Sequence, residues 1–570
     1  MSDTTTTTAA SHDPEFLYEF DREPIPKSRL LGPGYFAGAY AGEHVAATEF
    51  VIGVTFVNWG ASVQDIFFGL VIGNLMAVLT WTLVCAPIAV DTRLTLYWYL
   101  RKIGGPRLNS IYSVVNACLY SIMAGCMITV SASAVRIPFG IPPQLDWYPT
   151  DVRFVLVVLA VGAVVVTLAV LGFQRLATFA TVCSPWMFLM FIVGALAVLP
   201  ELFASSGEQG FFEMARTSVW TGQTPDGSEP MGFWKVAAFA WICNLGMHGA
   251  LSDMALFRFA RKKSYGLFSS FGMFLGHYLA WICAGLMGAG AAVLLGSPLV
   301  QLDAGEVGFQ ALGWAGALAV VIAGWTTSNP TLYRVGLALQ AVTPNWSRAK
   351  ITLVAGVVTT IVACFPFVFT GLLDYVAVYG LLISPIGAIV VTEHWIFPRT
   401  GLRRYWSSHA GHAINWAALL AWTISVALAV VLERTGTMHL FYLFLPVYGC
   451  GMVSYWLLAK AMGAGGSDIA ESDAAPEEPP AVPAASVTRR SPVDRRMAIS
   501  GIVAALALVA CVWLGYCTLT APVESYRAML AKLHTQLPIP TLLYFVAGTI
   551  FFTLRERSKR DGAATEAAQP

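Results

Sequence analysis

The stretch His44-Val-Ala-Ala-Thr48-Glu49 has a counterpart much later in the chain, His248-Gly-Ala-Leu-Ser252-Asp253. Each copy has a His, an Ala two residues on, then a hydroxyl residue and a carboxylate, and a Gly stands two residues before each His. Both copies lie in otherwise apolar surroundings. Ionisable side chains are costly inside a bilayer and usually have a function there. The repeat therefore predicts a matched pair of polar, glycine-containing membrane helices.

The composition of the whole chain supports a membrane location. Of the 570 residues, 56% are hydrophobic and 12% are Asp, Glu, Lys or Arg, whereas soluble proteins carry about 25% charged residues. Most of the surface must therefore face lipid. The net charge of +1 gives no electrostatic reason to expect a nucleic acid as partner. The ten Cys are scattered singly, without the spacing of a disulfide framework or a metal site.

Fourteen runs of the chain approach the roughly 20 apolar residues that a membrane helix needs. We therefore expect an all-α polytopic membrane protein with about 14 transmembrane helices. The first twelve runs are 35–58, 62–90, 108–135, 152–172, 177–203, 232–257, 268–296, 307–340, 350–371, 373–396, 411–433 and 437–462, and the last two are 497–520 and 537–554.

The polar segments divide the chain into five parts. We expect residues 1–34 to be a disordered cytoplasmic tail and 35–462 to be a core of 12 helices. Residues 463–496 are acidic and rich in Pro and Ala, which is typical of a disordered linker. Two extra transmembrane helices should follow over 497–555, and residues 556–570 should form a cytoplasmic tail.

Basic residues alternate between successive loops, which indicates the orientation. Lys and Arg gather after spans two, six, eight and ten and at the C-terminus, whereas the opposite loops are acidic or neutral. The group after span eight is assigned as Arg334, Arg348 and Lys350. The positive-inside rule then places both termini in the cytoplasm and requires an even number of spans. We expect a multi-pass protein of the plasma (inner) membrane.

The two polar spans lie five spans apart, so they run in opposite directions through the membrane. Inverted repeats with glycine-interrupted helices in matching positions are typical of transporter binding sites. Irregular backbone is tolerated at membrane depth only where it lines a cavity or is buried in protein. We expect Thr48 and Ser252 to cap the helices that resume after each break. The alternative is chance, because the match is short and degenerate.

The ionisable residues of these two spans are the first candidates for a site. They are Glu43, His44, Glu49, His248 and Asp253. Glu43, His44 and His248 are predicted to bind substrate. Glu49 and Asp253 are predicted to relay protons or to act as structural charges, for example as partners of Arg258. His277 lies in an otherwise apolar span and is interpreted as a structural histidine.

Span eight carries two adjacent hydroxyl residues, Thr326 and Thr327, which could hold a cation. Sodium is a hard cation that prefers oxygen ligands. The two hydroxyls and the carbonyl of Ala323, one turn back, could supply three oxygens, and carbonyls of the broken first span could complete the shell. The alternative is that both hydroxyls only bond to the carbonyl one turn back.

Five segments, in the order in which the family has them, carry a resemblance to a known family. They are Ser62–Leu75 in span two, Phe257–Arg261 after span six, Trp325–Tyr333 in span eight, and Ser384–Gly387 with Asn415-Trp416 in spans ten and eleven. The resemblance extends over roughly residues 35–460. The chain resembles the nucleobase–cation symporter-1 family, which includes cytosine and hydantoin permeases.

This resemblance implies a fold and an activity. The fold is the five-plus-five inverted repeat first described for a bacterial leucine transporter. The activity is cation-coupled uptake of a nucleobase or related nitrogen heterocycle at the membrane midplane. In sodium-coupled members the ion lies between helices one and eight, which corresponds here to Ala323, Thr326 and Thr327. The coupling ion is expected to be sodium or a proton, with no organic cofactor.

The family's substrate site draws on helices one, three, six and eight, and two of these helices depart from its pattern. Asn116, Leu119 and Tyr120 stand where helix three often has a Gln followed three residues later by Trp. Helix six has Asp253 and Arg258 with four residues between them instead of Asp-x-x-Arg. These changes bear on which side chain stacks on the substrate and on which substrate is carried.

The remaining substrate-binding predictions concern amides and aromatic rings. Asn116, Asn244 and Asn329 are expected to read the edge of a ring. Trp241, Tyr120 or Trp325 could stack on its face, since aromatic faces suit flat rings. The expected partners are a small heterocyclic substrate and membrane lipid, and the sequence does not indicate an oligomeric state.

Two other functions stay open. The same fold could carry an amino acid or a cationic vitamin, because intramembrane carboxylates suit a cationic group. A membrane-embedded sensor or metal enzyme could use the His and carboxylate residues instead. The sequence has no HExxH, P-loop or nucleophile-elbow motif, so we do not expect an enzyme.

Overall fold

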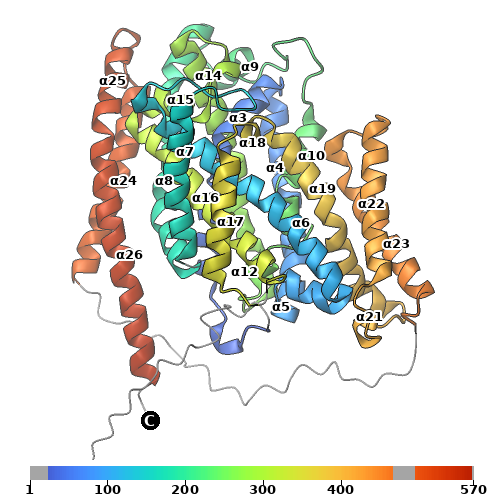
Figure 1. Cartoon of the computed structure of the whole chain (residues 1–570). Helices are drawn as coiled ribbons and strands as arrows, with labels where there is room; N and C mark the ends of the chain where they lie inside the picture. Colours follow the sequence, from blue (N-terminus) through green and yellow to red (C-terminus); the bar gives the residue numbers. More distant parts are fainter. Residues whose placement is uncertain (1–22, 172, 344, 466–494, 568–570) are drawn as a thin grey trace, which may run out of the picture.

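The computed structural model describes residues 23–171, 173–343, 345–465 and 495–567. Within these residues nearly all regular structure is helical, and the extended pairing consists of two isolated bridges. Nine helices of the described part are individually long and apolar enough to cross a membrane. The expected all-α, multi-pass membrane class is confirmed, and Figure 1 shows the bundle.

The helices of the first repeat follow the expected spans. Span one is α2 (Pro33–His44) and α3 (Thr48–Asn58), and span two runs through α4 (Leu70–Thr80), η3 (Trp81–Cys85) and α5 (Ala86–Thr92). Spans three, four and five are α6 (Leu96–Val135), α7 (Val152–Val170) and α8 (Phe173–Ser206). In α6 the backbone kinks at Gly105, whose φ of 78° is in the left-handed region that glycine adopts readily.

The second repeat begins with another broken span. Span six is α10 (Phe233–Ile242), α11 (Leu245–His248) and α12 (Met254–Phe257), and span seven is η6 (Gly272–Ala280) followed by α14 (Trp281–Leu295). Span eight is α15 (Ala304–Leu312) and α16 (Trp314–Gln340), and spans nine and ten are α17 (Arg348–Ala363) and α19 (Leu372–Val391). The last two core helices are α22 (Trp416–Arg434) and α23 (Phe444–Ala461).

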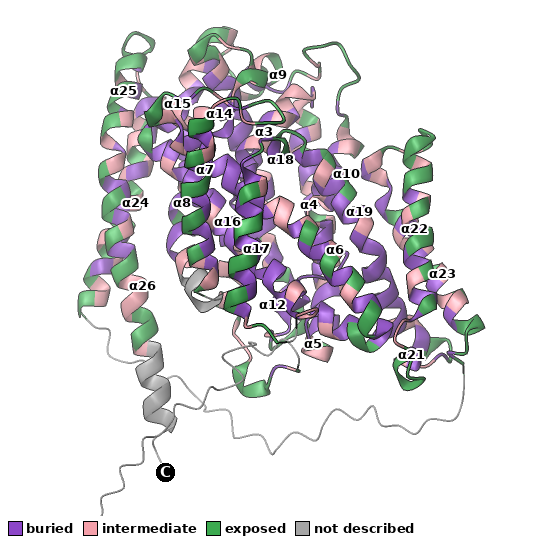
Figure 2. Cartoon of the chain, viewed as in Figure 1, coloured by how far each residue is buried: buried purple, intermediate pink, exposed green. Residues whose placement is uncertain are grey.

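The most buried helices are those that surround the broken spans. Helix α16 packs along α6, α3 packs along α14, and α19 contacts α11. Figure 2 shows buried residues concentrated in the middle of the bundle, whereas α22, α24 and α17 carry exposed faces. Large apolar side chains such as Leu506, Trp513 and Val357 are exposed on those outer faces. Lipid is the natural environment for such a surface.

Span one is interrupted at residues 45–47, between α2 and α3. A glycine of η6 lies directly against this break. A Cβ atom built on Gly276 would lie 1.9 Å from the carbonyl oxygen of His44. Only a residue without a side chain therefore allows η6 to approach the broken backbone this closely.

The break in span six contains an unusual backbone conformation. Buried Leu251 has a φ of 66°, which costs a non-glycine residue about 1–2 kcal/mol. The predicted caps are wrong. The N-cap of α3 is Ala47, which makes no side-chain cap bond, and the Ser252 hydroxyl donates backward to the Gly246 carbonyl at 2.8 Å. The hydroxyl closes the irregular loop on itself instead of starting a helix.

The two extra C-terminal helices pack against α8. They are α24 (Arg495–Leu519) and α26 (Pro538–Ala567), joined through α25 (Tyr526–Gln536). Trp186 Nε1 donates to Thr541 Oγ1 at 3.1 Å, and the Tyr544 hydroxyl donates to the Val182 carbonyl at 2.6 Å. Figure 1 shows this group at the opposite edge of the bundle from α22 and α23.

The expected tails and linker are only partly described. Of the expected N-terminal tail, residues 1–22 lie outside the described residues. The described remainder contacts the core: the Ile25 N–H bonds to the Arg93 carbonyl, and the Leu31 N–H bonds to the Phe259 carbonyl. Most of the expected linker, residues 466–494, also lies outside the described part. Helix α26 continues through most of the expected C-terminal tail, to Ala567.

Candidate functional site

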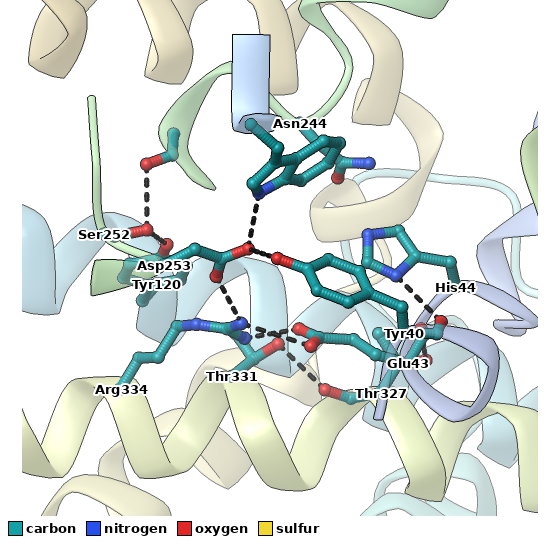
Figure 3. Close-up of polar contacts among 12 residues, drawn as sticks. Tyr40, Glu43, His44, Tyr120, Asn244, Ser252, Asp253, Thr327, Thr331 and Arg334 are labelled. Carbon is teal, nitrogen blue, oxygen red and sulfur yellow. Dashed lines mark hydrogen bonds and ion pairs between the residues drawn. The ribbon is translucent and has the colours of Figure 1, made fainter. Parts of the chain in front are cut away.

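A buried arginine joins the two broken spans to α16. Arg334 Nη2 lies 2.8 Å from Asp253 Oδ1 and 3.1 Å from Glu43 Oε2, and Nη1 also donates to the Glu43 carboxylate. All three side chains are nearly inaccessible to solvent. Figure 3 shows Arg334 reaching from α16 to a position between the two carboxylates. One guanidinium therefore joins α16, to which Arg334 belongs, to α2 and to the irregular part of span six.

The second carboxylate oxygen of Asp253 accepts two hydrogen bonds. Its Oδ2 accepts a hydrogen bond from the Tyr40 hydroxyl at 2.6 Å and from Trp81 Nε1 at 2.7 Å. Hydrogen bonds of this kind, together with a paired charge, offset the cost of burying a carboxylate. From its place in span six, Asp253 thus contacts side chains of spans one, two and eight.

Arg334 does not lie where the loop-charge pattern predicts it. The pattern places it in a cytoplasmic loop, but it is 5% exposed and lies inside α16. It also replaces Arg258 as the partner of Asp253. Arg258 Nε donates to the Ala255 carbonyl at 3.2 Å, and its guanidinium lies over the Phe259 ring.

A small cavity lies where the two broken spans meet. Its volume is about 60 Å³, which is room for a few water molecules. Span one contributes Glu43, His44, Thr48 and Glu49 to its wall, and span six contributes Asn244. The other polar or aromatic lining residues are Tyr120 of α6, His277 of η6, Thr327 and Thr331 of α16, and Tyr379 of α19. We call this the central cavity.

A second cavity of about 50 Å³ lies on the other side of the Glu43 carboxylate. Its lining includes Glu43, Thr326, Asn329, Tyr333 and Arg334. Glu43 is the residue that lines both cavities, and its carboxylate is held by Arg334. The ion-paired side chains therefore form part of the wall between the two spaces.

The predicted cation ligands lie close together. The Thr327 hydroxyl is 2.9 Å from the Glu43 carbonyl oxygen and 3.1 Å from the Ala323 carbonyl oxygen, and the Thr326 hydroxyl is also 3.1 Å from Ala323. Two carbonyls and two hydroxyls from α2 and α16 thus gather at one place. These neutral oxygens fit a sodium ion chemically, and they also satisfy one another by ordinary hydrogen bonds.

Three predicted substrate residues line neither cavity. The Asn116 side chain donates to the Tyr97 hydroxyl at 2.8 Å, and Trp241 Nε1 donates to Thr80 at 3.1 Å. His248 Nε2 lies 2.8 Å from the Trp241 carbonyl oxygen, which fixes the imidazole inside span six. Of the other predicted substrate residues, Glu43, His44, Tyr120 and Asn244 meet at the central cavity, and Asn329 lines the second one.

Glu49 and His277 form a second polar pair at the central cavity. His277 Nε2 lies 3.6 Å from Glu49 Oε1, and the His277 ring stacks on Trp281 with the centroids 4.4 Å apart. Trp281 Nε1 donates to the other oxygen of Glu49. The interpretation of His277 as only structural missed this contact, although an intramembrane His was the available signal. Tyr40 and Trp81 gave no signal, because aromatic residues are common in membrane spans.

The broken first and sixth spans, with a polar cavity between them, are features of the leucine-transporter-type fold. No family model and no curated protein matches the sequence. Among solved structures, the chain is similar to Mhp1, a nucleobase-cation-symport-1 family transporter, in a closed conformation with bromovinylhydantoin bound. That likeness has a TM-score of 0.58 and 15% identity, and covers 77% of this chain and 96% of Mhp1.

Two further structures agree with this fold. The inward-facing conformation of Mhp1 has a TM-score of 0.57 and 16% identity, and covers 77% of this chain and 93% of that one. A Na⁺-coupled sialic acid symporter has a TM-score of 0.55 and 11% identity, and covers 78% and 92%. The expected inverted-repeat fold is confirmed. These structural neighbours are transporters, not enzymes.

Proposed function

We propose that this protein is a secondary active transporter that couples uptake of a nucleobase-like nitrogen heterocycle to entry of a cation. The observation that carries the proposal is the convergence of both broken spans on the central cavity, where imidazole, amide and phenol groups lie together. The fold class supports transport. The choice of a heterocycle rests on the chemistry of these side chains and on the family resemblance.

The central cavity offers both edge and face recognition for a ring. Within the described residues, buried His44 Nε2 has no hydrogen-bond partner. The Asn244 amide nitrogen lies 3.5 Å from both His277 nitrogens, which is long for a hydrogen bond. Both groups could pair with ring nitrogens and carbonyls. Tyr120 and Tyr379 both line the cavity and contact each other edge to face, with ring centroids 5.5 Å apart and an interplanar angle of 63°. We assign the stacking role to this pair, since Trp241 does not line the cavity.

The cavity must enlarge to accept a ring. Its volume of about 60 Å³ is far below the roughly 300–1,000 Å³ of ligand pockets. Tyr379 belongs to α19, and its ring forms one side of the space. Outward movement of α19, or of α2 on the other side, would make room. Alternating access by such movements is the working principle of inverted-repeat transporters.

We propose that the coupling cation is a sodium ion or a proton. For sodium, the candidate ligands are Ala323, Thr326 and Thr327, with the Glu43 carbonyl as a fourth oxygen. A bound sodium ion would neutralise part of the negative charge of the cavity wall and connect α2 with α16. These residues would then order span one when the ion binds. We also propose a plasma-membrane location with both termini cytoplasmic, based on the loop charges.

One observation favours a second candidate substrate class. Two carboxylates, Glu43 and Glu49, line the central cavity, and a cationic amine would neutralise them. An amino acid or a cationic vitamin would have such a group. Among the described residues, no group of three or more His, Cys, Asp or Glu could hold a metal ion.

Thermal stabilisation of the purified protein tests the substrate class. The panel contains nucleobases, hydantoins, amino acids and cationic vitamins, each with and without sodium. A ligand at 100 times its dissociation constant should stabilise the folded state by about 2.7 kcal/mol. We expect a nucleobase or hydantoin to raise the unfolding temperature, and Asn244→Ala to abolish that rise. Stabilisation by amines alone would favour the second candidate.

A further inference from the structure

Glu49 is a deeply buried carboxylate without a basic partner of fixed charge. It is 1% exposed, and its carboxylate contacts the Trp281 indole N–H, the His277 imidazole and the backbone of Ala46. Among the described residues, no Lys or Arg forms an ion pair with it. This environment differs from that of Glu43 and Asp253, which share the permanent positive charge of Arg334.

Removal of the proton from the pair of Glu49 and His277 costs much free energy. A carboxylate next to a neutral imidazole would be an isolated buried negative charge, which is very unfavourable in a medium of low polarity. One proton removes that cost, whether it resides on the carboxyl group or on the imidazole. Glu49 and His277 must therefore be treated as one unit that binds protons together.

We propose that Glu49 and His277 form a proton-binding site whose single proton is taken up and released during each transport cycle. This inference rests on the proposed transport function and names the proton as a coupling ion. Both residues line the central cavity. The pair therefore releases its proton when the cavity opens to water on one side of the membrane, and binds a proton again when the cavity opens on the other side. The balance is one proton moved across the membrane per cycle, with no bond other than O–H or N–H made or broken.

The surroundings determine which groups can influence this site. His44 of α2 faces His277 with ring centroids 5.4 Å apart, and Cys243 lies beside Glu49 at the end of α10. Across the cavity lie the Glu43 carboxylate, which Arg334 holds, and the phenols of Tyr120 and Tyr379. His44 is the nearest group that could share the proton, and the negative charge of Glu43 favours its retention.

Close packing connects the two members of the pair. Glu49 is in the first turn of α3, and the contact between α3 and α14 is very close. A Cβ atom on Gly53 of α3 would lie 2.5 Å from the Trp281 carbonyl oxygen. Because His277 stacks on Trp281, α3 carries both members of the pair with it. Access of water to the pair, rather than its separation, would then control proton release.

Transport in sodium-free proteoliposomes tests this site. The variants are Glu49→Gln, which keeps an acceptor for the Trp281 N–H, and Glu433→Gln as control, whose side chain is half exposed at the end of α22. An inward proton gradient should drive accumulation of the heterocycle by the wild type and the control. Glu49→Gln should lose accumulation but keep exchange of labelled for unlabelled substrate, because exchange requires no net proton movement.

Two results separate this proposal from the proposed function. A wild type that exchanges substrate but ignores the proton gradient, or a Glu49→Gln variant that accumulates like the wild type, overturns the proton site alone. A wild type that exchanges no heterocycle overturns the proposed function instead.

A measurement without substrate tests the proton site even if the wild type exchanges no heterocycle. Infrared spectra of purified His277→Gln should show the carbonyl band of a protonated carboxylic acid at neutral pH, because Glu49 must then carry the proton itself. The band should be absent from a Glu49→Gln/His277→Gln double variant. If the two spectra are the same, Glu49 is ionised without its partner and the proposal is wrong.

Discussion

Arg334 and Asp253 form a buried ion pair, 2.8 Å between nitrogen and oxygen, that ties α16 to the irregular part of span six. Arg334 also holds Glu43, so both broken spans depend on one guanidinium. Two carboxylates therefore share the single guanidinium of Arg334. This arrangement defines the wall between the two cavities.

Removal of the Arg334 side chain should be strongly destabilising. Arg334→Ala leaves two buried carboxylates unpaired, and breaking a buried pair in this way costs about 3–5 kcal/mol. The unfolding temperature of the detergent-purified protein should fall markedly, and Arg334→Lys should recover part of the loss. The control is Arg153→Ala, since Arg153 is exposed and its pair with Asp151 faces solvent. Equal effects of Arg334→Ala and Arg153→Ala would contradict the role of the buried cluster.

A single methyl group at residue 276 should disturb the break in span one. Gly276→Ala places a Cβ against the His44 carbonyl, and such overpacking costs about 1–3 kcal/mol. Thermal unfolding should show this loss, and substrate binding should weaken because His44 is displaced. In the control Gly449→Ala the new methyl group meets nothing within 4 Å, so stability should be kept or slightly raised. A Gly276→Ala protein as stable as the wild type would show that α2 can withdraw from η6.

Loss of the Thr327 hydroxyl should show which of the two candidate cations drives uptake. If sodium binds between α2 and α16, Thr327→Ala and Thr326→Ala should each raise the sodium concentration needed for half-maximal uptake. If protons alone drive uptake, both variants should keep their proton-driven transport. Ser328→Ala is the control, because Ser328 lies in the same turn of α16 but lines neither cavity. Uptake that requires sodium and is unchanged in both Thr variants would place the sodium site elsewhere.

Cysteine labelling from the outside should verify the orientation. Asp226 lies in the exposed loop before α10, and Arg399 lies exposed at the other end of the bundle, beyond α19. In intact cells a membrane-impermeant maleimide should label Asp226→Cys and not Arg399→Cys, with the wild type as background. After permeabilisation both positions should react. The reverse pattern would invert the proposed topology and place the termini outside.

Hydrophobic patterning predicted the spans well because each membrane helix must satisfy its own backbone and face lipid or apolar neighbours. The breaks in α2–α3 and α10–α12 were also predictable, since Gly and ionisable residues interrupt otherwise apolar runs. Arg334 was missed although it lay within the predicted span eight, because its charge was counted as a loop signal. Side-chain contacts such as Tyr40 with Asp253 depend on how helices distant in sequence pack, and one sequence carries no direct signal for them.

Gradient-driven uptake by the purified protein in liposomes tests the central claim most directly. Labelled purines, pyrimidines and hydantoins are offered under an inward sodium gradient, an inward proton gradient, or neither. We predict that at least one of these rings accumulates above its outside concentration only when a gradient is present, and that Asn244→Ala reduces this accumulation. Failure of every heterocycle to accumulate under either gradient, while an amino acid or cationic vitamin does, would contradict the account.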